Sequence, residues 1–189
     1  MIEDAIRIGK KLAFYGLIDG ASGNLSFRDG GKIVITKTGA ILDELSEDDF
    51  VEVEMGEKSG EASSDLLVHE KIYEETNYRV VLHCHGVYGV TLSLFFDEIL
   101  PMDLEGRLFI GNLKVVEGRF GSEDLAEKIA RSVKEKGICL VRGHGIYSAG
   151  RNFDEAFKLA SYLEHSCHVL FNYEIFRRSL ANPYHVCKQ

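Results

Sequence analysis

Two histidines in residues 80–86, VVLHCHG, are spaced for joint binding of a metal ion. The apolar run before them predicts a buried strand. Residues i and i+2 of a strand point to the same side, so His83 and His85 direct both imidazoles at one point. Imidazole is a common ligand of Zn²⁺ and related ions. Taken alone the pair is a weak signal, because histidines at strand ends are often ordinary hydrogen-bonded groups.

A third histidine provides the pair with a partner. His144 stands in residues 139–145, CLVRGHG, another apolar run that ends in histidine, here between two glycines. Three histidines with an open fourth position are typical of a catalytic zinc site rather than a structural one. His165 and His168 share one face of an expected long helix, but no glycine flanks them, which favours packing or surface roles.

Three polar segments upstream of the histidines contain residue types that bind anions. Residues 22–26, SGNLS, place an asparagine amide beside a glycine that lets the backbone approach a ligand. Residues 36–39, TKTG, could bind an anion through a nest of N–H groups. Ser63 and Ser64, next to Asp65, precede an expected helix whose first N–H groups favour phosphate. Each segment alone is equally typical of a turn, a polar loop or an ordinary helix cap.

Alternating helices and strands must position these residues. His69 lies one turn after Asp65 on the same helix face, either as a partner of that carboxylate or as a surface histidine. Ser63 or Ser64 is the expected N-cap of this helix. The predicted elements begin with helix 2–16, hairpin strands 21–28 and 32–36, strand 50–54 and the helix ending near 75. Strand 80–82, helix 88–96, strands 108–110 and 113–116 and the helix ending near 136 follow. The last elements are the strand ending in His144, its partner strand 146–149 and helix 154–178.

Composition narrows the class of protein. The 189 residues are enough for one domain with a sizeable core. The net charge of −8 disfavours binding to nucleic acids or anionic membranes. No apolar run approaches the roughly 20 residues of a transmembrane helix, and the N-terminus lacks a signal-peptide core. We therefore expect a cytoplasmic protein, and reduced thiols suit its four scattered cysteines: Cys84, Cys139, Cys167 and Cys187.

Taken together and in order, the motifs resemble the class II aldolase/adducin-head family, which holds L-fuculose-phosphate aldolase and L-ribulose-5-phosphate 4-epimerase. The motifs are SGNLS at 22–26, TKTG at 36–39, SSD at 63–65, HCH at 83–85 and GHG at 143–145. The resemblance covers nearly the whole chain as one domain, 1–189. It implies an α/β fold with three layers, α/β/α, around a mostly antiparallel sheet, and a homotetramer with active sites at subunit interfaces.

The resemblance also implies a role for each motif. His83, His85 and His144 would hold Zn²⁺ or another divalent metal, and Asp65 would be the catalytic carboxylate. The substrate phosphate would be held by a set of polar residues, namely Asn24, Thr38, Gly39, Ser63 and Ser64.

Two departures from the family pattern concern the acid and a tyrosine. Asp65 stands where the aldolases usually carry glutamate, whereas the 4-epimerase branch has aspartate there. The tyrosine that aldolases contribute from a neighbouring subunit is not evident between 97 and 110. Glu105 is the nearest polar candidate there, and Tyr184 is a candidate in the tail.

The implied function is that of a zinc-dependent lyase of carbohydrate metabolism. The resemblance implies an aldolase that would cleave a ketose phosphate, similar to fuculose 1-phosphate, to dihydroxyacetone phosphate and an aldehyde through an ene-diolate. A 4-epimerase of the L-ribulose-5-phosphate type and a methylthioribulose-phosphate dehydratase are alternatives on the same scaffold. A metal-stabilised binding protein without catalysis is the alternative from another class, and a carboxylate beside an open three-histidine site argues against it.

Overall fold

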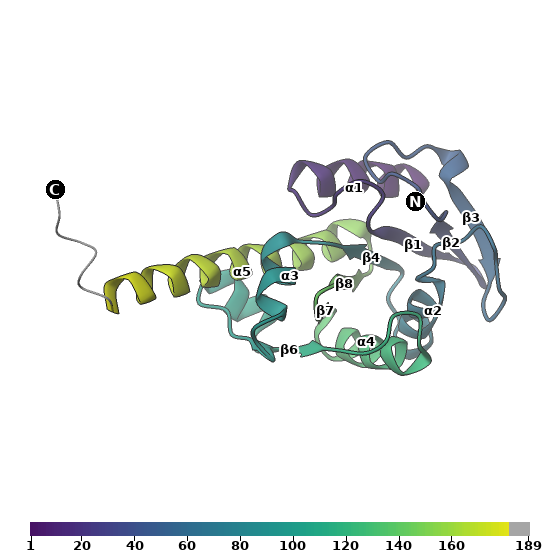
Figure 1. Ribbon diagram of the computed structural model, residues 1–189. Coiled ribbons are helices and arrows are strands. Elements are labelled where there is room, and N and C mark those ends of the chain that lie inside the picture. The colour runs from purple at the N-terminus through teal and green to yellow at the C-terminus, as the bar shows by residue number, and fades with distance from the viewer. Residues whose placement is uncertain (182–189) are drawn as a thin grey trace.

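A computed structural model describes residues 1–181 of the chain (Figure 1). Its strands are β1 (Asn24–Asp29), β2 (Lys32–Thr36), β3 (Phe50–Glu54), β4 (Val80–Cys84), β5 (Glu98–Ile99), β6 (Leu113–Val116), β7 (Ile138–Val141) and β8 (Gly145–Gly150). Its helices are α1 (Ile2–Phe14), α2 (Leu66–Glu75), α3 (Val87–Ser93), α4 (Glu123–Lys136) and α5 (Phe153–Ala181), with a 3₁₀ turn η1 (Glu47–Asp49) and a π-helical turn η2 (Gly106–Ile110).

The eight strands form one sheet in the order β3-β2-β1-β4-β8-β7-β6-β5. Within the described residues the neighbouring strands pair antiparallel, except β6 and β7, which are parallel. The predicted α/β fold with a mostly antiparallel central sheet is therefore confirmed. Strands β4 and β8 are adjacent at the middle of the sheet, so the candidate site residues near their ends lie midway across its width.

Helices cover both faces of the sheet and make the three layers visible in Figure 1. Helices α1, α3 and α5 pack on one face, where Leu82 and Leu140 join a core with Leu163 of α5. Helices α2 and α4 pack on the other face, where Val81 joins a core with Ile129 of α4. Because strand residues alternate between faces, His83 points to the same side as Val81, toward α2.

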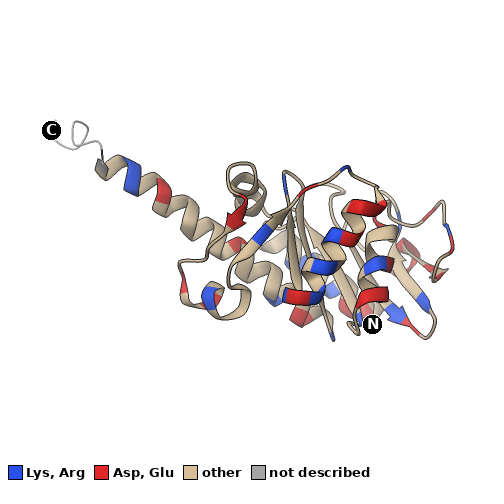
Figure 2. Cartoon of the chain, turned by 90° about the horizontal axis from the view of Figure 1, so that it is seen from below, with Lys and Arg blue, Asp and Glu red and all other residues tan. Residues whose placement is uncertain are grey.

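Charged residues lie mainly on the outer surfaces of the helices. Figure 2 shows acidic and basic residues interspersed there rather than segregated by sign. On α4, Lys128 bonds Asp124 at 2.7 Å and Lys134 reaches Glu75 of α2 at the same distance. Exposed pairs of this kind contribute only about 0–1 kcal/mol each to stability.

The start of α2 differs from the sequence prediction. Asp65, not Ser63 or Ser64, is the N-cap residue, and its side chain makes no cap hydrogen bond. The Ser63 hydroxyl instead accepts a hydrogen bond from the Asp65 backbone N–H at 3.3 Å, as in a turn that precedes the helix. This turn leaves the Asp65 carboxylate available to the interior.

The predicted strand over 108–110 is wrong, because these residues belong to the π-helical turn η2. Leu108 and Phe109 are both exposed, so the segment has no alternation of buried and exposed side chains. Gly106 begins the turn where it meets α5, and a Cβ there would stand 2.1 Å from Ser166 Oγ. The strand predicted at 113–116 is confirmed as β6.

The three cysteines in the described residues are buried free thiols, and burial raises the pKa of Cys139 to about 12. Cys84 and Cys167 have raised pKa values for the same reason. Cys187 and Tyr184 lie outside the described residues. Among residues 1–181, no helix has the length and apolar character that a membrane span requires.

Candidate active site

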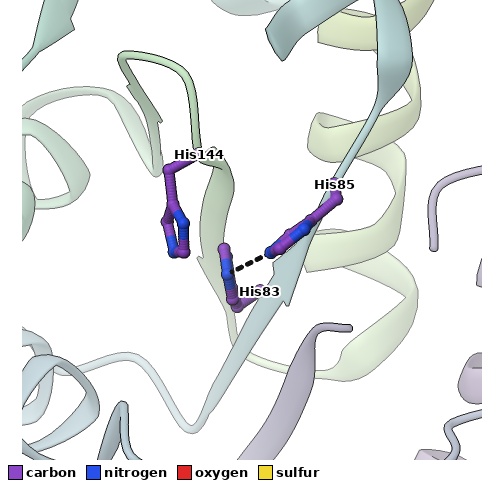
Figure 3. Close-up of side chains that lie close together, drawn as sticks. All are labelled: His83, His85 and His144. Atoms are coloured by element: carbon purple, nitrogen blue, oxygen red, sulfur yellow. Dashed lines mark hydrogen bonds between the residues drawn. The ribbon is translucent and has the colours of Figure 1, made fainter. Parts of the chain in front are cut away.

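The three predicted histidines converge at the ends of two adjacent strands. His83 is in β4, His85 follows it, and His144 stands in the turn between β7 and β8. Their ligand atoms all lie within 4.8 Å of one another, and the two Nε2 atoms of His83 and His85 are 2.9 Å apart. Figure 3 shows the three rings directed at a common point.

The sheet register brings these residues together. Cys84 of β4 stands opposite Ile146 of β8, two residues after His144. Gly145 makes this close approach possible, because a Cβ there would lie 2.4 Å from the Cys84 carbonyl oxygen and about 3 Å from the His85 ring. The glycine that follows His144 in the sequence therefore has a packing role beside the histidine cluster.

A backbone carbonyl fixes the orientation of the His83 ring. His83 Nδ1 lies 3.0 Å from the Ile146 carbonyl oxygen, which can only accept, so Nδ1 carries the hydrogen and Nε2 directs a lone pair at the cluster. Burial lowers the pKa of His83 to about 3 and also lowers the pKa values of His85 and His144. The neutral imidazole is the form that binds metals.

The donor set fits a divalent ion such as zinc. Zinc–nitrogen bonds of about 2.1 Å place tetrahedral ligand nitrogens roughly 3.4 Å apart, and the histidine ligand atoms all lie within 4.8 Å of one another, with one pair at 2.9 Å. A ligand imidazole whose second nitrogen donates to a carbonyl is a common arrangement in metal sites, and His83 has it. Three nitrogens leave a coordination position free for a substrate or water.

The Asp65 carboxylate borders the cluster. It is 4% exposed, and its Oδ2 lies 3.7 Å from His83 Nε2. The same oxygen accepts hydrogen bonds from Asn24 Nδ2 at 2.8 Å and from the Tyr147 hydroxyl at 3.1 Å. Burial acts to raise the pKa of Asp65, but the electrostatic interaction with the neighbouring His83 and the hydrogen bond from Asn24 outweigh it, so the pKa is lowered. Asp65 is therefore an ionised acceptor within the interior.

A buried chain of polar groups runs from Asp65 into the protein. Asn24 Oδ1 lies 2.6 Å from His69 Nε2, and His69 Nδ1 lies 2.6 Å from the Ser26 hydroxyl. The Ser26 hydroxyl in turn lies 2.7 Å from the Tyr73 hydroxyl. His69 is fully buried, so the surface alternative for this histidine is wrong and its side chain is a partner of Asn24.

The loops predicted to hold phosphate lie side by side. Residue 37 forms an isolated β-bridge with residue 62, and the Ser63 N–H donates to the Thr36 carbonyl at 3.0 Å. The Thr38 hydroxyl donates to the Ala62 carbonyl at 2.7 Å. Gly39, with φ of +81°, has open space where a side chain would stand, and Ser64 is exposed. We call these loop residues the polar rim; it ends at Ser64, the residue directly before Asp65 in the chain.

Other candidates are placed differently. Both polar atoms of the Asn24 side chain are engaged by Asp65 and His69, at the inner end of this rim. Glu105 is exposed at η2 and lines a separate cavity with Glu164 and His168 of α5. His168 stacks on Tyr88 with ring centroids 3.9 Å apart, which is a packing role.

Two aromatic residues at the site were not identified from the sequence. Tyr147 stacks on His83 with ring centroids 4.0 Å apart and planes 10° apart. It stands directly opposite His83 in the register of β4 and β8, so the strand pairing would have revealed it. Phe120, half-exposed in a loop, lies 5.5 Å from the His144 ring centroid, and no local pattern marks it.

Comparison with known proteins identifies the class. The family described as Class II Aldolase and Adducin N-terminal domain matches residues 3–171 of this chain. The chain therefore belongs to the class II aldolase and adducin family, as the motifs predicted.

Individual relatives carry related activities in their names. An L-fuculose phosphate aldolase of Methanocaldococcus jannaschii is 30% identical over 163 residues, covering 84% of this chain and 89% of its own. A methylthioribulose-1-phosphate dehydratase of Persephonella marina is 29% identical over 187 residues, which cover 88% of this chain and 87% of that protein. The crystal structure of L-fuculose-1-phosphate aldolase from Thermus thermophilus superposes with a TM-score of 0.89 at 30% identity, covering 93% of this chain and 95% of that one.

Proposed function

We propose that this protein is a metal-dependent aldolase that cleaves a ketose phosphate similar to fuculose 1-phosphate. The products are dihydroxyacetone phosphate and an aldehyde, formed through an ene-diolate. The observation that carries the proposal is the ionised Asp65 carboxylate, 3.7 Å from His83 Nε2 in an open three-histidine cluster. The similarity to fuculose phosphate aldolases in sequence and in fold supports the choice of substrate.

The residues of this chain divide the work of the reaction. His83, His85 and His144 would hold a zinc or other divalent ion, which would supply Lewis acidity toward a substrate carbonyl. Asp65 moves a proton between its carboxylate and the substrate hydroxyl at the bond that breaks, a role worth about 10²–10⁴-fold in rate. Phosphate binding at the polar rim, away from the reacting carbons, orients the substrate. The proposed phosphate residues are Asn24, Thr38, Gly39, Ser63 and Ser64.

A dehydratase of methylthioribulose 1-phosphate is the second candidate. The Persephonella marina relative with this activity in its name covers nearly the same part of the chain as the aldolases. Such a reaction breaks a carbon–oxygen bond and releases water, whereas the aldolase reaction breaks a carbon–carbon bond. A 4-epimerase would release neither product, so the three alternatives on this scaffold differ in what an assay detects.

Product analysis tests the proposal. Zinc-loaded protein is incubated separately with fuculose 1-phosphate, ribulose 5-phosphate and methylthioribulose 1-phosphate. Release of dihydroxyacetone phosphate is followed through NADH oxidation by glycerol-3-phosphate dehydrogenase. We expect dihydroxyacetone phosphate from fuculose 1-phosphate. Its absence, together with a dehydrated product from methylthioribulose 1-phosphate, would replace the aldolase by the dehydratase.

Asp65→Asn tests the role of the carboxylate. Asparagine keeps the size of the side chain and an oxygen that accepts hydrogen bonds, but it cannot take a proton. We expect kcat to fall by about 10²–10⁴-fold while one metal ion per chain is retained. Asp48→Asn, on the exposed 3₁₀ turn η1, is the control and should keep wild-type activity. Full activity of Asp65→Asn would remove Asp65 from the mechanism.

We also propose that the protein is a cytoplasmic homotetramer with sites at its subunit interfaces. Large apolar side chains are exposed on α1, α3 and the segments around η2, and exposed apolar patches are typical of protein interfaces. These side chains are Phe14, Val87, Phe95, Leu104, Leu108 and Phe109. The buried free thiols suit a reducing compartment. Light scattering during gel filtration should give four times the chain mass of 21.2 kDa, and a monomer mass would exclude the assembly.

A further inference from the structure

Tyr147 contacts three groups of the candidate site at once. Its hydroxyl lies 3.1 Å from Asp65 Oδ2 and 3.2 Å from His144 Nε2, while its ring stacks on His83. The residue is 1% exposed, so water does not compete for these contacts. Within the described part of the chain, Tyr147 thus connects two of the three clustered histidines with the acid beside them.

The hydrogen-bonding capacity of the hydroxyl fixes its direction. An ionised carboxylate only accepts, so the single hydroxyl proton of Tyr147 is donated to Asp65. The oxygen of Tyr147 then presents lone pairs to His144 Nε2, from which it can accept a hydrogen only while that nitrogen is protonated. When His144 Nε2 acts as a metal ligand it has no hydrogen to donate to Tyr147. The hydrogen bond from the Tyr147 hydroxyl to Asp65 then remains.

Two donors reach the same carboxylate oxygen from different elements. Asn24 Nδ2 approaches Asp65 Oδ2 from β1 at 2.8 Å, and the Tyr147 hydroxyl approaches it from β8. Together they hold Oδ2 of Asp65 at its position 3.7 Å from His83 Nε2. The Ile146 carbonyl and the Tyr147 ring likewise fix the His83 ring, one by its edge and the other by its face.

We propose that Tyr147 is a positioning residue that fixes Asp65 and the His83 ring relative to each other. It thereby sets the metal affinity and the turnover rate. The inference rests on the proposed metal-dependent site and deepens it. Tyr147 acts through its neighbours, since its hydroxyl is enclosed by Asp65 and His144. Outer partners that orient metal ligands typically change metal affinity or activity by about 10–100-fold when removed.

Tyr147→Phe removes the hydroxyl and keeps the ring that stacks on His83. Tyr78→Phe is the matched control, because Tyr78 packs partly buried against the same core as Tyr147, and within the described residues its hydroxyl has no hydrogen bond to Asp65 or to the clustered histidines. Both variants lose one phenolic oxygen atom, so a loss of stability common to both is not a loss of positioning. Thermal unfolding of each variant, followed by circular dichroism, checks that both fold.

Metal binding is measured apart from activity. Apoprotein prepared with a chelator is titrated with Co²⁺, whose visible absorption reports ligand geometry, and Zn²⁺ affinity is obtained by competition with a chromophoric chelator. For Tyr147→Phe we expect about 10-fold or greater weakening of Zn²⁺ binding, a changed Co²⁺ spectrum and a lower kcat. Tyr78→Phe should stay within about twofold of the wild type in Zn²⁺ affinity and in kcat.

A double-mutant cycle with Asp65→Asn tests the route of the effect. If the hydroxyl acts through the carboxylate, Tyr147→Phe should lower kcat much less in the Asp65→Asn background than in the wild type. Wild-type Zn²⁺ affinity and Co²⁺ spectrum in Tyr147→Phe, or equal shifts in Tyr78→Phe, would overturn the inference while leaving the metal site intact. A wild-type protein that binds neither ion would overturn the proposed function and this inference with it.

Discussion

Acid should destabilise the wild-type protein more than a variant without His69. This histidine is fully buried in α2 between Asn24 and Ser26, and its desolvation lowers its pKa from 6.5 to about 4 despite the opposing charge of Asp65. In the unfolded chain the imidazole regains the ordinary value of about 6.5. Between these two pH values the unfolded chain therefore binds a proton that the folded protein does not.

The sign and size of the effect follow from linkage. Because the unfolded state binds more protons in this window, the free energy of unfolding falls as the pH falls from 6.5 toward 4. The difference of 2.5 pKa units corresponds to about 3 kcal/mol over the whole window. Between pH 7 and pH 5, His69 alone lowers the free energy of unfolding by about 2 kcal/mol.

Urea unfolding of metal-free protein at a series of pH values measures this term. His69→Gln keeps an N–H donor for Asn24 but has no titrating ring, so its unfolding free energy should decline about 2 kcal/mol less than that of the wild type between pH 7 and 5. The clustered histidines and Asp65 are present in both proteins, and their contributions cancel in the difference. His165→Gln, which removes an exposed histidine of α5, is the control and should follow the wild type.

Two outcomes of this measurement would refute the reasoning. If the wild type and His69→Gln lose stability in parallel as the pH falls, then His69 is not held neutral by burial. If the unfolding free energy of His165→Gln depends on pH as weakly as that of His69→Gln, then removing any histidine produces the effect.

The metal site yields two further predictions. His83→Ala should abolish stoichiometric zinc binding and turnover together, which elemental analysis after dialysis and the dihydroxyacetone phosphate assay would measure; one zinc per chain in this variant would exclude His83 as a ligand. Gly145→Ala should lose about 1–3 kcal/mol of stability and weaken zinc binding, because its Cβ would stand 2.4 Å from the Cys84 carbonyl oxygen. Gly31→Ala, with nothing within 4 Å, is the control for Gly145→Ala, and equal urea midpoints and zinc affinities in the two variants would contradict this packing role.

The sequence allowed the histidine cluster to be predicted because its signal is local. The two-residue spacing of His83 and His85 reports a strand face directly, and the glycines beside His144 mark a close approach of backbones. Most element positions were predictable for the same reason, since helical and strand periodicities extend over many residues. The η2 turn was not, because its apolar residues 108–110 look like a short strand unless their exposure is known.

Contacts that depend on pairing between distant segments could not be predicted residue by residue. Tyr147 joins the site only because β8 pairs with β4 in a register that sets it opposite His83. The partnership of His69 and Asn24 likewise requires α2 to lie over β1, 45 positions away in the chain. The sequence offered His69 two environments, and only tertiary packing selected the buried one.

Asp65 determines the direction of every hydrogen bond in the chain of residues behind it. An ionised carboxylate can only accept, so Asn24 turns its amide nitrogen toward Asp65 and its oxygen toward His69. His69 must then carry its proton on Nε2 and accept at Nδ1 from the Ser26 hydroxyl, which in turn accepts from Tyr73. Protonation of His69 would place a second hydrogen on Nδ1 and force the Ser26 hydroxyl to reverse. Burial keeps His69 neutral, and the neutral ring donates to the Asn24 oxygen, so that the Asn24 amide nitrogen stays turned toward the Asp65 carboxylate.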